Sequence, residues 1–129
     1  MIIMATVEML KPGQFHHENK TWLRLLEFFK QENTVLKNRL AEVLDHKTDK
    51  GFLAHAEHFQ NSFILKDEFI DELRHDVNIQ AQSLTSKDEN VLDPKIVKKQ
   101  EKLRNEMEYL EADFAKLKNE FNKYLSTNL

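Results

Sequence analysis

Residues 94–125 read PKIVKKQEKLRNEMEYLEADFAKLKNEFNKYL. Apolar residues recur in this stretch at alternating steps of three and four, at Ile96, Leu103, Met107, Leu110, Phe114, Leu117, Phe121 and Tyr124, and Gln100 is the one polar residue in the series. Such steps place side chains on one face of an α-helix, and the series extends over about four heptads. The stretch therefore predicts a long helix with a coiled-coil-like apolar seam.

The residues Asp93 and Pro94 mark the start of this helix. An aspartate before the first turn can accept a hydrogen bond from a free backbone amide, and proline suits the first helical position because no amide bond is lost there. We therefore expect the helix to extend from Pro94 to about Leu125.

Two further segments, at about 14–46 and 50–84, repeat the pattern. Their seam residues are Trp22, Leu26, Phe29, Asn33, Leu36, Leu40 and Val43, and then Phe52, Ala56, Phe59, Phe63, Lys66, Ile70, Leu73, Val77, Gln80 and Leu84. With 2 glycines and 2 prolines in 129 residues, the chain has too few turn residues for a sheet-rich fold. A polar loop at 46–51 and a polar linker at 85–90 are short, and short connections between long helices require antiparallel neighbours.

The predicted fold is all-α: an up-down-up antiparallel three-helix bundle with coiled-coil-like heptad packing over residues 14–129. A short apolar arm, residues 1–13, precedes it. The arm lacks a basic start and contains Glu8, so we do not interpret it as a signal peptide. The absence of cysteine and of a long apolar run, together with a net charge of −3, favours a cytoplasmic protein with no nucleic-acid and no membrane partner.

Catalytic motifs are not found in the sequence. None of the four serines lies in a glycine-flanked turn, and Gly13 and Gly51 stand alone rather than in a phosphate-binding loop. We therefore expect neither an enzyme nor a cofactor.

Histidines suggest an alternative function. His55 and His58 are three residues apart on one helix, and the opposing helix end supplies Glu42 and His46. Imidazole is a common ligand of transition metals, so these four residues are candidate ligands in a small metal- or ligand-binding bundle. The competing interpretation is that they are solvated or helix-capping side chains.

A second apolar stripe lies outside the seams. Leu25, Phe28 and Val35 widen the first helix, Leu65, Phe69 and Ile79 widen the second, and we expect the two sets to converge beside the groove between these helices. Large apolar patches on monomers are uncommon, so a second subunit, the N-terminal arm, or a hydrophobic ligand or partner should cover them. The predicted function is a non-catalytic protein–protein interaction or self-assembly module that binds itself or another helix.

Polar and charged residues give predictions about the helix register. Folding the helices back places Gln80 opposite Gln100, with His16 or His17 at the same end, and places Asn33 level with Phe63 and Lys66. A basic cluster at Lys95, Lys98, Lys99 and Lys102 should lie against the acidic end of the second helix, at Asp71, Glu72 and Asp76.

Overall fold

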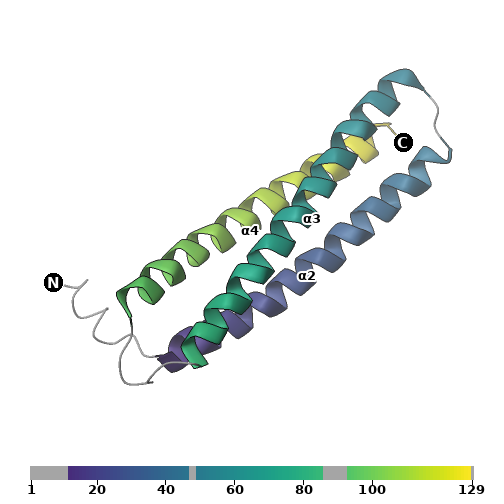
Figure 1. Ribbon diagram of the computed structural model, residues 1–129. Helices are drawn as coiled ribbons and strands as arrows, with labels where there is room; N and C mark the ends of the chain where they lie inside the picture. Colours follow the sequence, from purple (N-terminus) through teal and green to yellow (C-terminus); the bar gives the residue numbers. More distant parts are fainter. Residues whose placement is uncertain (1–11, 47–48, 86–92, 129) are drawn as a thin grey trace.

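The computed structural model describes residues 12–46, 49–85 and 93–128 as three helices (Figure 1). They are α2 (Pro12–Leu44), α3 (Lys50–Thr85) and α4 (Pro94–Asn128). The helices form an elongated rod in which α2 and α4 run in one direction and α3 runs in the other (Figure 1). The predicted all-α three-helix bundle is confirmed, and the described residues contain no strand.

The helix bounds differ from the predicted ones by a few residues. α2 begins at Pro12, so Pro12 and Gly13 belong to its first turn and not to the arm. α2 ends at Leu44, and His46 lies in a turn in which its backbone amide bonds to Val43 O at 3.1 Å. The rest of the predicted arm and residues 86–92 of the linker lie outside the described residues.

Aspartates cap the starts of α3 and α4. The Asp93 carboxylate accepts a hydrogen bond from the Lys95 amide at 2.9 Å, which confirms the predicted cap of α4. Asp49 plays the same part for α3, since its carboxylate accepts a hydrogen bond from the Phe52 amide at 3.3 Å. The loop predicted at 46–51 therefore ends before Lys50, because a capping aspartate starts the helix and a glycine in the first turn does not prevent it.

The seams of all three helices meet in a main apolar core, and Phe15, Leu84 and Ile96 form a smaller cluster of their own. Of the predicted seam residues, Val43, Lys66 and Tyr124 are half-buried and the others are buried. Rings fill the wide part of the core, where Phe63 lies edge-on to Phe121 with ring centroids 5.1 Å apart. Phe15 and Asn19, which the prediction missed, are also buried, and so is Leu125 at the predicted end of the last helix. Phe15 and Asn19 continue the steps of three and four backward from Trp22, so the same pattern could have found them.

Among the three helices, α3 is the central one. The backbones of α2 and α4 come close to each other at fewer places than either does to α3. Side chains bridge the wider gap between α2 and α4, and the rings of Phe29 and Phe114 meet there with centroids 5.4 Å apart. None of the helices in the described ranges combines the length and apolar character that crossing a bilayer requires.

Replacing Gly51 with alanine should stabilise the protein. Gly51 lies in the first turn of α3 without a positive φ, and a Cβ added there would be 3.8 Å from its nearest neighbour, an oxygen of Asp49. We expect Gly51→Ala to raise the free energy of unfolding by about 0.5–1 kcal/mol, because alanine loses less backbone entropy in a helix. Urea denaturation measures this change, and a loss of stability would contradict the position of Gly51 in α3.

Candidate interaction surfaces

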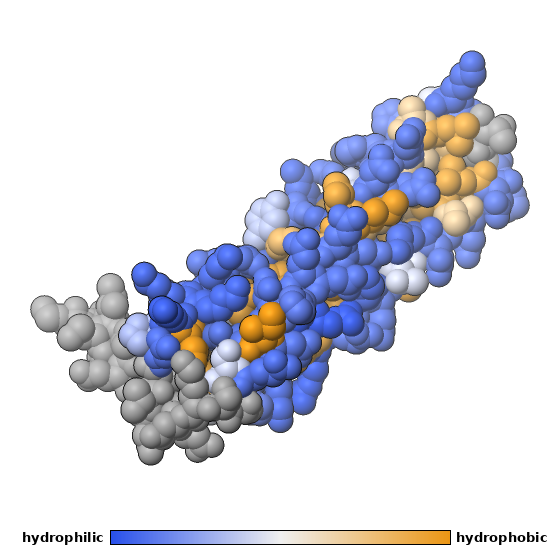
Figure 2. Space-filling view, viewed as in Figure 1, coloured by the Kyte–Doolittle hydropathy of each residue, from blue (hydrophilic) through white to orange (hydrophobic). Residues whose placement is uncertain are grey.

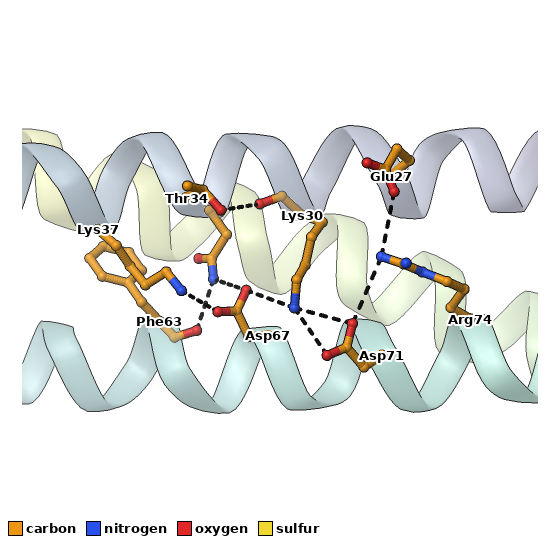
Figure 3. A network of polar contacts seen from close by, with 9 residues as sticks. Glu27, Lys30, Thr34, Lys37, Phe63, Asp67, Asp71 and Arg74 are labelled. Atoms are coloured by element: carbon orange, nitrogen blue, oxygen red, sulfur yellow. Dashed lines mark hydrogen bonds and ion pairs between the residues drawn. The ribbon is translucent and has the colours of Figure 1, made fainter.

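A ladder of polar contacts occupies the groove between α2 and α3 (Figure 3). Asn33 donates hydrogen bonds from its side-chain amide to Phe63 O and to an Asp67 oxygen, both at 2.8 Å. Lys37 also pairs with Asp67, and Lys30 Nζ lies 3.0 Å from Asp71 Oδ2. The bond to Phe63 confirms the prediction that Asn33 lies level with Phe63. The ladder also shows that polar side chains line the α2/α3 groove (Figure 3), beside which the sequence predicts apolar residues.

Asp67 is the centre of this ladder. Burial acts to raise the pKa of Asp67, but the hydrogen bonds from Lys37 and Asn33 and the charge of Lys30 outweigh it and lower the pKa below its ordinary value of 3.8. The ionised carboxylate is therefore the form that the folded protein favours. It holds donors from α2 against α3, and so it helps to fix the register of the two helices.

A second polar layer crosses the bundle near the start of α2. Gln80 donates to Gln100 Oε1 at 3.1 Å, which confirms the predicted pairing. Gln100 in turn donates to Asn19 Oδ1 and to Glu18 Oε1, both at 2.9 Å. This layer therefore joins all three helices. Its members on α2 are Glu18 and Asn19, which directly follow His16 and His17 in the sequence.

His16 and His17 lie at this end of the bundle, as predicted, next to Glu18 and Asn19, but neither histidine joins the polar layer. Both side chains are exposed, because Asn19 and not a histidine occupies the seam position on α2. Glu18 accepts hydrogen bonds from Arg104 Nε at 2.9 Å and from its Nη2 at 2.7 Å, and the hydrogen bond with Glu18 raises the pKa of Arg104. The sequence analysis did not single out Arg104, since an arginine beside a seam has no distinctive spacing.

The apolar residues of α2 outside the seam lie on the side of this helix that faces α4. Leu25 is seven residues after Glu18 and seven before Glu32, and both glutamates pair with residues of α4. Residues seven apart share a helix face, so Leu25 faces α4 as well. Phe28 and Val35 lie next to this side of α2 and are more exposed than Leu25. We call Leu25, Phe28 and Val35 the α2 apolar face.

The apolar residues of α3 outside the seam also lie on the side facing α4. The ring of Phe69 contacts the ring of Tyr109 on α4, with centroids 6.1 Å apart. Leu65 is one turn before Phe69. Ile79 is one turn after Asp76, and Asp76 pairs with Lys99 of α4. We call Leu65, Phe69 and Ile79 the α3 apolar face.

The two apolar faces therefore border α4 on opposite sides and do not converge beside the α2/α3 groove. The convergence expected from the sequence is wrong, because α4 packs between the two flanks and the polar ladder takes the remaining groove. On the surface seen in Figure 2, apolar side chains form separate patches between hydrophilic ones. In the part of the chain that the structure describes, the flanking residues predicted to converge thus form two separate apolar faces.

An open groove of about 720 Å³ separates α3 and α4 on the outside of the rod. The residues that line it are Phe69, Glu72, Asp76, Lys98, Glu101, Lys102, Asn105, Glu106 and Tyr109. One ion pair of the predicted contact between the basic start of α4 and the acidic end of α3 is found beside this groove, where Lys99 Nζ lies 4.0 Å from Asp76 Oδ2. Asp71, which the sequence predicts to take part, pairs instead with Lys30 of α2. Lys102 instead pairs with Glu106 of its own helix at 3.7 Å.

The candidate metal ligands do not form a site. His55 faces α4, where its ring lies 5.8 Å from that of Tyr124, and its Nδ1 is 2.9 Å from Gly51 O. Glu42 is exposed near the end of α2, His46 is exposed in the turn that follows α2, and His58 is exposed on α3. Within the described residues, no three histidine or carboxylate side chains are placed together to hold a metal ion.

Compared with family models, curated proteins and solved structures, the chain shows no match. Helical bundles serve many unrelated functions, so the fold alone assigns none. The function therefore has to be argued from the surfaces described above.

The stability contributed by Asp67 should depend on pH. Because folding lowers its pKa below 3.8, the contribution is complete above that pH and is lost as the pH falls through the folded-state value. We expect Asp67→Asn to lower the free energy of unfolding by about 1–2 kcal/mol at neutral pH. The difference from the wild type should shrink in acid.

Urea unfolding at neutral pH and below the ordinary aspartate pKa measures both differences. Asp45→Asn is a suitable control, because Asp45 is exposed at the end of α2. An Asp67→Asn effect of equal size at both pH values would contradict the role given to the ionised carboxylate.

Proposed function

We propose that this protein is a non-catalytic interaction module that acts through helix–helix contact, in the first place with a second copy of itself. The supporting observation is the exposure of large apolar side chains beside α4. Phe28 and Val35 on α2 are 53% and 59% exposed, and Leu65 and Ile79 on α3 are 63% and 47% exposed. Full burial of one such side chain contributes about 1.5–3 kcal/mol, so covering either face would favour association.

The shape of the molecule supports a helix as the binding partner. Small-molecule sites are usually enclosed and largely apolar, whereas the groove between α3 and α4 is open and lined by charged side chains. The residues of the apolar faces recur along their helices at intervals of about one, two and three turns. A helix laid along such a row can bury several of them at once, which is a common mode of peptide and protein recognition.

The test is the mass of the protein in solution, measured by light scattering after size-exclusion chromatography over a range of concentrations. We expect a mass above the 15.3 kDa of one chain, rising with concentration. Phe28→Glu and Leu65→Glu each place a charge on one apolar face, and at least one of them should return the mass to that of a single chain.

The matched controls carry the same new charge on the same helices but outside the apolar faces. Asn38→Glu on α2 and Gln60→Glu on α3 replace exposed polar side chains, and Gln60 is seven residues before Asp67, on the side of α3 that faces α2, so both controls should leave the mass unchanged. A wild-type protein that has the mass of one chain at every concentration would contradict the proposed function.

A further inference from the structure

The outer side of α4 carries a row of lysines. Lys95, Lys102, Lys116 and Lys123 follow one another at multiples of seven residues, with Tyr109 at the centre of the row. Seven residues return to the same face of a helix and span about 10.5 Å, so the row is straight and evenly spaced. All five side chains are exposed, and Tyr109 contacts Phe69 of the α3 apolar face.

The positive charges of these lysines are mostly not neutralised by ion pairs within the described part of the chain. Lys102 pairs with Glu106 one turn away, and the other three make no ion pair with any residue in the described ranges. Three of the four positive charges therefore remain available to an acidic surface, and the fourth, on Lys102, is shared with Glu106. We define the α3/α4 face as the surface formed by the α3 apolar face, the lysine row with Tyr109, and two acidic residues of α3, Glu68 and Glu72. The groove between α3 and α4 is part of this face.

The neighbouring side of α3 carries the opposite charge. Glu68 and Glu72 are exposed, make no ion pair within the described ranges, and lie three and seven residues after Leu65. The contact of Phe69 with Tyr109 shows that this part of α3 is level with the middle of the lysine row. The α3/α4 face thus has an acidic strip on one helix, a basic strip on the next, and apolar side chains between them.

We propose that two copies of this chain associate through the α3/α4 face, about a two-fold axis parallel to the rod. That axis lays α3 of one copy over α4 of the other, so Glu68 and Glu72 meet the lysine row of the partner. The same operation brings the two apolar centres together, and a contact of this kind is closed and self-complementary. The inference rests on the proposed function and specifies which face is used and how.

Other ways of covering the face are less favourable. A two-fold axis across the rod would lay α3 on α3 and place Glu68 and Glu72 against their own copies. An acidic helix from another protein would match the lysine row but would meet the same two glutamates. Like charges brought together in an interface lower affinity by several kcal/mol, so the two-fold axis along the rod is the arrangement that uses both strips.

Charge reversal on one helix at a time provides the test. The double variant E68K/E72K makes both strips basic, and the double variant K102E/K116E makes the α4 strip acidic like α3. In a dimer of either variant alone, α3 of each copy would face an α4 strip of the same charge. In an equimolar mixture, the basic strips of one variant can face the acidic strips of the other at both α3–α4 contacts.

We expect each double variant alone to weaken self-association by at least about tenfold, and the mixture to restore it as a heterodimer. Sedimentation equilibrium measures the dissociation constants, and circular dichroism verifies that each variant is helical. The wild-type dissociation constant should rise with salt concentration, because salt screens the exposed ion pairs.

Controls with the same change in net charge but on other surfaces are E108K/E111K on α4 and K20E/R24E on α2, all at exposed positions. Neither control should weaken association to the same extent, and mixing the two should restore nothing. A mixture of the test variants that stays as weak as its components overturns the inference.

The outcomes separate this inference from the proposed function. Self-association that withstands both charge reversals but is lost in Phe28→Glu overturns the α3/α4 arrangement and leaves the proposed function in place. A wild-type protein that never exceeds the mass of one chain overturns both.

Discussion

The burial of one apolar seam shared by three helices is the constraint on which this structure depends. No helix in the chain could bury its own seam, and a long helix in water gains most of its stability from packing. The central position of α3 follows, because its seam is covered by α2 on one side and by α4 on the other. Within the core, the ring of Phe121 contacts the rings of both Phe59 and Phe63.

Polar residues on the seam give this apolar packing a defined register. A uniform seam would allow neighbouring helices to slide by one heptad at little cost, whereas a buried polar group must keep its partner. Asn33 is held by Asp67 and Phe63 at one level, and Gln80 is held by Gln100 at another. Two such levels, far apart along the rod, fix the helices against both sliding and tilting.

A fixed register also determines which surface residues act together. The side of α3 that carries Leu65 and Glu72 lies beside the lysine row of α4 only because Phe69 and Tyr109 are level. The resulting face has acidic, basic and apolar side chains in parallel strips. Such a face is complementary to a second copy of itself that is related by a two-fold axis along the rod. Self-recognition would then need no cavity and no catalytic group, which agrees with an α3/α4 groove that is open and lined mostly by charged side chains.

The sequence by itself determined the three helices, the cap at Asp93, nearly all of the core and the pairing of Gln80 with Gln100, because each of these follows from spacing along one helix or from folding the chain at a short connection. Only the tertiary structure decided that the apolar flanks lie apart, that His55 packs against Tyr124, and that Glu18 pairs with Arg104. The physical reason is that a seam specifies which side of a helix is buried but not on which side of the first two helices the third one packs. Either hand of the bundle buries the same seams, and only the three-dimensional arrangement assigns each flank its neighbour.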